Sequence, residues 1–141
     1  MAGLVLVGGA PAEAVEPQVA PCPVSGRVTH EFGPSPAGFH YGLDIANTAG
    51  SPIKAGLAGK VTSSGSSGPL GEYIVVTHPD RTKTIYAHLR KRSVGVGTSV
   101  NSVTKIGEMG ATGTSDGRPR LHLEVLDGER INPRVKYKCP R

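Results

Sequence analysis

Short runs of alternating apolar and polar residues recur along the chain, and this alternation is the pattern of half-buried β-strands. The clearest run is RLHLEV, which spans residues 120–125. Its two leucines and its valine share one face of a strand, and its arginine, histidine and glutamate share the other. Other runs are GKVTSSG, EYIVVTH and KTIYAHL, which are rich in β-branched residues or Tyr and are bounded by turn residues. The pattern predicts several short strands.

The composition leaves little room for helices. The chain has 141 residues, and 20 of them are Gly and 12 are Pro, two residue types that interrupt helices. This length is enough for one domain with a buried core. We find no internal repeat and no heptad pattern. We therefore predict an all-β protein with little helix.

The basic charge changes this picture little. The net charge of +5 comes from 16 basic and 11 acidic residues, and the basic side chains are scattered apart from RKR at residues 90–92. With two Phe, four Tyr and no Trp, the chain offers few platforms on which single-stranded nucleic acid could stack. We therefore expect a solvated basic face and no nucleic-acid partner. Such a face would also suit the anionic envelope of a bacterium.

Residues 1–22 lack strand or helix periodicity and are typical of a leader followed by a linker. Residues 2–10 are small or apolar, and AEA at 12–14 has the small-x-small form of a signal-peptidase site. No Lys or Arg precedes Arg27, so a truncated start and a disordered tail stay as alternatives to a signal peptide. We expect export. The apolar run is too short to span a bilayer, and we predict no transmembrane segment.

Two cysteines agree with export. Cys22 and Cys139 bracket the expected domain almost end to end. In an exported chain, such a pair indicates a disulfide that ties the two ends together, and the alternative is two unrelated buried thiols. No CxxC pair occurs, which argues against a cysteine zinc site.

Three histidine motifs contain the candidate chemistry. In FHYGLDIA, His40 and Asp44 share one face of an extended segment, and Gly42 between them leaves both free to reach one ion. Alone, this spacing is more often a hydrogen-bonded pair. Together with His122 of RLHLEV, the pair offers three ligands and an open position, which is the coordination of a catalytic zinc. His88 of TIYAHLR would then orient or deprotonate a zinc-activated water, although alone it reads as a half-buried sheet histidine.

The chain resembles the lysostaphin-like zinc endopeptidases, which cut peptide bonds in bacterial peptidoglycan. The resemblance covers Val24 to Tyr137 and rests on motifs in family order: FHYGLDIA, AGSPIKAGLAGKV, GEYIVVTHPD, IYAHL, IGEMGATGTSDG, RLHLEV and INPRVKY. It implies one lysostaphin-like metallopeptidase domain over residues 23–141, preceded by the leader and linker that the composition of residues 1–22 indicates. It also implies a compact antiparallel β-sheet domain with a substrate groove walled by loops.

The same resemblance implies a function and a site. It implies Zn²⁺ ligands at His40, Asp44 and His122 and a catalytic histidine at His88. The expected protein is a secreted, cell-wall-associated monomer that hydrolyses peptidoglycan peptides with zinc-activated water as the nucleophile. Bonds of the cross-bridge and of the stem peptide are both open as targets.

One position departs from the family pattern. The family has a histidine two residues before the last ligand, and this chain has Arg120. Arginine is always charged and cannot act as a base, but it can stabilise an oxyanion if Glu124 or Asp116 balances its charge. If Arg120 turns outward instead, the position is functionally empty. The alternative function is therefore a weak or inactive zinc-containing relative that binds peptidoglycan or regulates another wall hydrolase. A β-rich carrier with incidental histidines is the third hypothesis.

Four further positions receive weaker predictions. His30 is a surface histidine by default and a groove residue as the alternative. Alternation in TIYAHLR predicts that Tyr86 and His88 share one strand face, opposite Ile85, Ala87 and Leu89. On that face, Tyr86 either lines the groove with His88 or packs in the core. His78 is predicted to begin a turn and receives no catalytic role, and Asn132 belongs to a structural turn.

Overall fold

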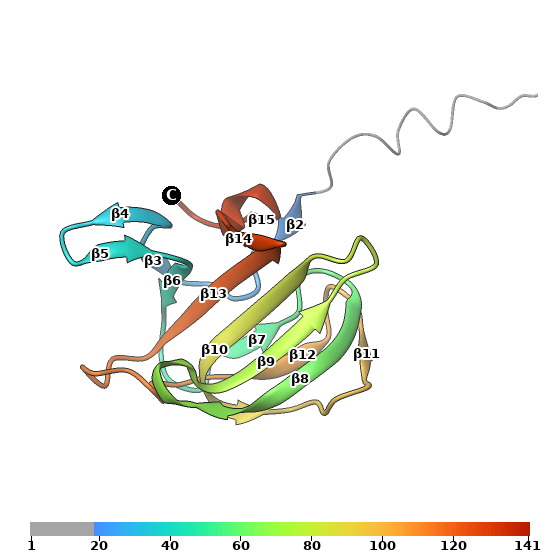
Figure 1. The fold of residues 1–141 in the computed structure, drawn as a ribbon. Coiled ribbons are helices and arrows are strands. Elements are labelled where there is room, and N and C mark those ends of the chain that lie inside the picture. The colour runs from blue at the N-terminus through green and yellow to red at the C-terminus, as the bar shows by residue number, and fades with distance from the viewer. Residues whose placement is uncertain (1–18) are drawn as a thin grey trace, which may run out of the picture.

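A computed structural model describes residues 19–141, and it confirms an all-β protein with very little helix (Figure 1). The two helices within this range are single 3-10 turns, η1 (Gly68–Leu70) and η2 (Pro133–Val135). The first seven strands are β2 (Ala20–Pro21), β3 (Arg27–His30), β4 (Gly33–Ser35), β5 (Gly38–His40), β6 (Leu43–Ala46), β7 (Pro52–Lys54) and β8 (Gly59–Ser67). The other strands are β9 (Gly71–Thr77), β10 (Lys83–Arg92), β11 (Ser99–Val100), β12 (Lys105–Met109), β13 (Arg120–Asp127), β14 (Glu129–Ile131) and β15 (Tyr137–Lys138).

Ten of these strands form one antiparallel sheet. Its main path has the order β11-β8-β9-β10-β13-β6-β3, and β12 joins β10 to β7 while β14 pairs with β13. The long strands β8, β9, β10 and β13 lie side by side, and the small β4–β5 hairpin projects beyond β6 (Figure 1). The antiparallel architecture agrees with the predicted fold class.

The apolar row of RLHLEV lies in the core, as its alternation predicts. Leu121, Leu123 and Val125 of β13 are fully buried. In the register of β13 with β6, Leu121 lies opposite Ile45 and Leu123 lies opposite Leu43, and both β6 residues are also fully buried. The polar row of β13 faces away from this core, which leaves it available for a site.

A bulge in β10 changes the direction of His88. The strand pairs with β13 as far as Ala87 and with β12 from Leu89 onward, and His88 between them has a positive φ of 65°. This backbone conformation breaks the alternation of the strand. The prediction that Tyr86 and His88 share one face is therefore wrong: Tyr86 enters the core, and His88 turns to the side of His122.

Tyr86 takes part in a buried polar network. Its hydroxyl donates to the Ala55 carbonyl and lies 3.2 Å from the hydroxyl of Tyr137. The Tyr137 hydroxyl lies 2.8 Å from Thr84 Oγ1, which lies 2.8 Å from His78 Nε2. Of the two alternatives for Tyr86, the structure supports core packing. His78 begins the turn between β9 and β10, as predicted, and its side chain anchors that turn.

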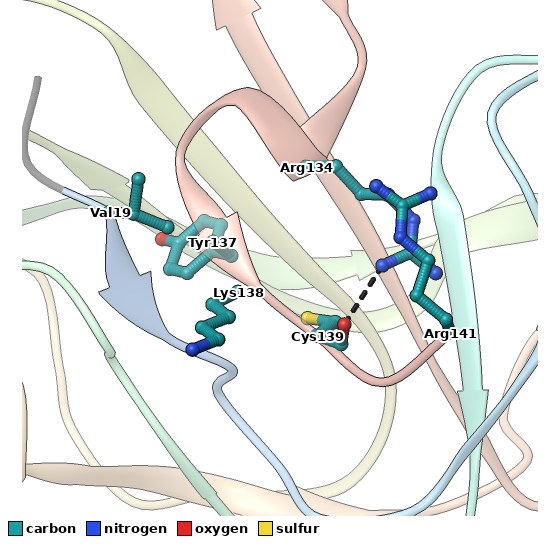
Figure 2. Close-up of a pocket in the computed structure, with 6 residues that line it drawn as sticks. All are labelled: Val19, Arg134, Tyr137, Lys138, Cys139 and Arg141. Atoms are coloured by element: carbon teal, nitrogen blue, oxygen red, sulfur yellow. Dashed lines mark hydrogen bonds between the residues drawn. The ribbon is translucent and has the colours of Figure 1, made fainter.

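The two ends of the described chain are joined. Cys22 and Cys139 form a disulfide across 117 residues, which confirms the predicted pairing. β2 and β15 pair in parallel beside it. Arg134 donates to the Cys139 carbonyl at 2.9 Å, at the edge of a pocket of about 270 Å³ between the chain ends (Figure 2). These contacts fix the C-terminal segment against the start of the domain.

The predicted leader lies outside the described residues up to position 18, and the end of the predicted linker contributes β2. Within residues 19–141, no helix has the length and apolar character needed to cross a membrane.

Candidate metal centre

Three predicted ligands converge at one point on the polar side of the sheet. His122 on β13 lies directly opposite Asp44 on β6, and His40 ends the neighbouring β5. Asp44 Oδ1 lies 2.6 Å from His122 Nδ1 and 3.4 Å from His40 Nε2. One ligand atom from each of the three residues lies within 4.8 Å of the others. The set can hold one metal ion.

A strand break between β5 and β6, and not one continuous strand, brings His40 and Asp44 together. The sequence predicts a single extended segment, but β5 ends at His40 and β6 begins at Leu43. Gly42 in the break has the predicted spatial role. A Cβ at Gly42 would lie 2.6 Å from both His122 Cε1 and the backbone oxygen of Leu123, so a side chain there would displace the ring or the strand that carries it.

The orientation of His40 is fixed by Glu31, which is itself held by Arg134 near the C-terminus. Its Nδ1 donates to the Glu31 carbonyl at 3.0 Å, which leaves Nε2 directed at Asp44. The Glu31 carboxylate accepts two hydrogen bonds of 2.8 Å from the guanidinium of Arg134. Such partners behind a histidine hold the ring in the geometry that a metal requires.

His122 is oriented by a second carboxylate. Its Nε2 lies 3.1 Å from Glu124 Oε1, and Glu124 Oε2 accepts from Arg130 Nε at 2.9 Å. Burial lowers the pKa of His122, but the hydrogen bonds to Asp44 and Glu124 outweigh it and raise the pKa to about 9. The two carboxylates thus favour positive charge at this position, and a metal ion would compete with the proton on Nδ1.

His88 lies beside the three ligands and is buried. Its ring centroid is 5.7 Å from that of His122, and its Nδ1 donates to the Thr112 carbonyl at 2.8 Å. Burial holds the pKa of His88 below its usual value. Thr112 is itself fixed, because its hydroxyl donates to the Leu89 carbonyl and accepts from the backbone N–H of Glu72. His88 is therefore a neutral, oriented imidazole near neutral pH.

Arg120 turns toward the site and not outward. Its side chain is only 18% exposed, and its Nε lies 3.7 Å from Asp44 Oδ2. Of the two carboxylates expected to balance its charge, Asp116 does so, with a hydrogen bond of 2.7 Å from Nη1. A backbone hydrogen bond from Arg118 and that from Arg120 lower the pKa of Asp116 to about 2. Glu124 is bonded to other partners.

His30 lies at the edge of the same cluster. It faces Asp44 across the β3–β6 pairing, and its Nδ1 is 3.5 Å from Asp44 Oδ2. Its side chain is nevertheless 64% exposed. His30 is therefore a surface residue that also borders the metal centre.

The β4–β5 hairpin adds an aromatic wall. Phe32 and Phe39 pack edge to face at 5.2 Å, and Phe39 and Tyr41 pack at 4.8 Å. Phe39 and Tyr41 are exposed and flank His40 in the sequence. These three rings form an aromatic cluster on the hairpin that ends at His40.

Sequence reasoning found the three converging residues, His88 and Arg120, but not the groups that orient them. The alternation in RLHLEV places Glu124 on the face of His122, so its contact could have been predicted. No sequence signal points to Glu31 or Thr112, because each acts through a backbone carbonyl.

Comparison with protein families gives one match. The sequence model of peptidase family M23 matches residues 38–133. DD-carboxypeptidase/endopeptidase Mpg of Neisseria meningitidis is 37% identical over 96 residues, which are 67% of this chain and 22% of that protein. Murein hydrolase activator NlpD of Escherichia coli is 36% identical over 113 residues, which are 79% of this chain and 29% of that protein. The chain thus spans between a fifth and a third of the length of these two curated relatives.

Solved structures have the same fold. The catalytic domain of lysostaphin from Staphylococcus simulans is 31% identical, with a TM-score of 0.72 over 77% of this chain and 89% of that chain. A zinc containing peptidase from Vibrio cholerae is 32% identical, with a TM-score of 0.76 over 88% of this chain and 41% of that chain. On the match over residues 38–133, supported by these relatives, the chain belongs to peptidase family M23.

Proposed function

We propose that this chain is a zinc-dependent endopeptidase that hydrolyses peptide bonds of bacterial peptidoglycan. The observation that carries the proposal is the convergence of His40, Asp44 and His122 beside a buried, neutral His88. Membership of a peptidase family and likeness to the lysostaphin catalytic domain support the reaction class. The likeness to a zinc containing peptidase supports the metal.

The donor set suits zinc. Two imidazole nitrogens and one carboxylate oxygen are the ligands of many catalytic zinc sites, and each of these histidines has a hydrogen-bond partner on its other nitrogen. The ligands would be His40 through Nε2, Asp44 through Oδ1 and His122 through Nδ1. When bound, zinc supplies a Lewis acid and lowers the pKa of a water to about 7.

Residues of the chain would supply the remaining steps. Neutral His88 presents Nε2 as a proton acceptor because its Nδ1–H donates a hydrogen bond to the Thr112 carbonyl. The same imidazole can return the proton to the leaving amine. Arg120 is a fixed cation at the edge of the site and would stabilise the oxyanion of the tetrahedral intermediate.

A second candidate function belongs to another class. The chain would be a weak or inactive relative that binds peptidoglycan and regulates another wall hydrolase. The likeness to murein hydrolase activator NlpD favours it, and so does the presence of arginine at position 120. The intact ligand set and the oriented His88 favour activity over this alternative.

The setting of the proposed enzyme follows from its substrate. We propose that it is exported and works in the cell wall as a monomer, with residues 23–141 as the catalytic domain. The disulfide between Cys22 and Cys139 suits an oxidising compartment.

Purified cell walls provide the test. We expect the zinc-loaded protein to release new amino termini from them, and a chelator should abolish the release until zinc is restored. A protein that holds zinc and binds the walls but releases no amino termini would support the regulatory function instead.

A further inference from the structure

A second polar pocket borders the candidate metal centre. Its volume is about 140 Å³, and it is lined by β3, the end of β6, the loop before β13 and the first residue of β13. Its charged lining side chains are Arg27, Arg118, Arg120 and Asp116, together with His30 as a titratable group. None of the metal-centre residues His40, Asp44 and His122 lines this pocket. It is therefore a neighbouring site and not the metal centre itself.

Asp44 separates the pocket from the metal centre, because its two oxygens face different partners. Oδ1 faces His40 and His122 at 3.4 and 2.6 Å. Oδ2 faces two residues of the pocket, His30 Nδ1 at 3.5 Å and Arg120 Nε at 3.7 Å. A ligand group in the pocket would therefore lie next to the metal centre, with the Asp44 carboxylate between them.

The pocket has more positive than negative charge. It contains three arginines and a single aspartate. Asp116 already has two partners, since its Oδ1 accepts hydrogen bonds from the Arg120 guanidinium and from the backbone N–H of Arg118. Among residues 19–141, the side chains of Arg27 and Arg118 form no ion pair. Two guanidinium groups are thus free to bind an anion.

An unsatisfied donor adds a second observation. Arg120 Nε is buried and has no hydrogen-bond partner within the described residues. The nearest carboxylate oxygen, Asp44 Oδ2 at 3.7 Å, is too far away for a hydrogen bond, so the Arg120 guanidinium keeps hydrogen-bonding capacity for a further acceptor. Guanidinium groups match a planar carboxylate with paired hydrogen bonds.

From this geometry we infer that the basic pocket of Arg27, Arg118 and Arg120 binds a carboxylate of the substrate peptide close to the bond that is cut. The inference rests on the proposed peptidase function and narrows its substrate class to peptides with a free carboxylate near that bond. The carboxylate is either the C-terminus of the peptide or an acidic side chain, since both offer the same two oxygens.

Four synthetic peptides of one cell-wall stem sequence test the inference. They are free or amidated at the C-terminus and free or amidated at the side-chain carboxyl group, in all combinations. Binding to the zinc-loaded protein is measured by calorimetry, and cleavage is measured separately by mass spectrometry. We expect amidation of one carboxyl group to weaken binding about tenfold, and that group identifies the source.

Two single variants and a control assign the effect to the pocket. In Arg27→Gln and Arg118→Gln, the free acid should bind about as weakly as the amide, with the binding of the amide unchanged. Lys60→Gln removes an equally exposed positive charge from β8, on the far side of the sheet, and should keep the full preference. Thermal unfolding checks that each variant is folded.

The outcomes separate this inference from the proposed function. Equal binding of all four peptides, or a preference that survives both arginine variants, would overturn the carboxylate pocket. A preference that both variants remove supports it. If that preference appears without cleavage, the pocket stands and the peptidase function fails.

Discussion

Asp44 connects the separate parts of the site. It is buried, and burial raises its pKa, but the hydrogen bond from His122 and the nearby charges outweigh burial and keep the pKa below the usual value. The charged carboxylate therefore faces His40 and His122 with one oxygen and Arg120 with the other. In our proposal, Asp44 would therefore border both the metal ion and the basic pocket.

Loss of His122 should weaken metal binding strongly. We predict that the wild-type chain binds about one zinc ion and that His122→Ala lowers the affinity by at least roughly a hundredfold, because one of three ligands is lost. Metal analysis after dialysis measures the content. The control is His78→Gln, which removes a histidine outside the cluster and should retain zinc. Unchanged zinc in His122→Ala would show that the metal binds elsewhere.

Arg120 offers a test of its own role. Because Asp116 directs Arg120 toward Asp44, we expect a working cation, so Arg120→His should leave activity unchanged or lower it by up to about a hundredfold. Cleavage of a cell-wall peptide at saturating zinc measures this. A large gain in activity would mean that the arginine is a defect and that the family histidine is the better group.

Most residues of the candidate site could be predicted from residue types and their spacing. His40, Asp44 and His122 could be named because histidine and aspartate are informative ligands and the motif order resembles a known family. The direction of Arg120 could not be predicted, since it depends on Asp116 in a loop whose shape the sequence does not encode locally.

At the scale of elements, two interruptions of strands build the site. The break between β5 and β6 lets His40 and Asp44 reach one point, and the bulge in β10 turns His88 out of the core side. A left-handed backbone at a histidine is uncommon and is held by its surroundings, here by the Thr112 loop. Regular strands would have placed Tyr86 and His88 on one face.

The break at Gly42 should be sensitive to a single methyl group. We predict that Gly42→Ala weakens zinc binding about tenfold or more, because the new Cβ would displace the His122 ring. Gly95→Ala is the matched control, since a Cβ at Gly95 would have nothing within 4 Å. A metal titration compares the two variants. Equal affinities would show that the ring of His122 moves without cost.

Strand periodicity predicted the core but not the interruptions. The apolar row of β13 is fully buried, as its alternation requires. Alternation also predicted one face for Tyr86 and His88, and this failed because a bulge depends on the two partners of β10, β13 and β12, which are distant in sequence.

At the scale of the whole molecule, closure of the chain ends supports the site. Arg134 connects the carbonyl of Cys139 with the carboxylate of Glu31, whose own carbonyl holds His40. The disulfide closes a loop of over a hundred residues and stabilises by roughly 4–5 kcal/mol in the chain-entropy model. The cysteine positions were sufficient to predict this closure, whereas the Arg134–Glu31 contact joins residues too distant to be read from the sequence.

Global stability should depend on pH through His78. Burial holds the pKa of His78 below its usual value, so the unfolded chain takes up this proton first as the pH falls below about 6.5. We predict that wild-type stability falls more than that of His78→Gln between about pH 7.5 and 5. Urea unfolding at both pH values measures the difference. Identical pH dependence in both proteins would place the titration elsewhere.

The proposed peptidase activity is tested most directly by mass spectrometry of peptidoglycan fragments after digestion by the zinc-loaded protein. His88→Ala, with the same zinc content, is the comparison. We predict defined peptide cuts by the wild-type chain, their loss with chelator, and a rate about 10²–10⁴-fold lower in His88→Ala. Fragments that are unchanged from undigested walls, with zinc fully bound, would contradict it.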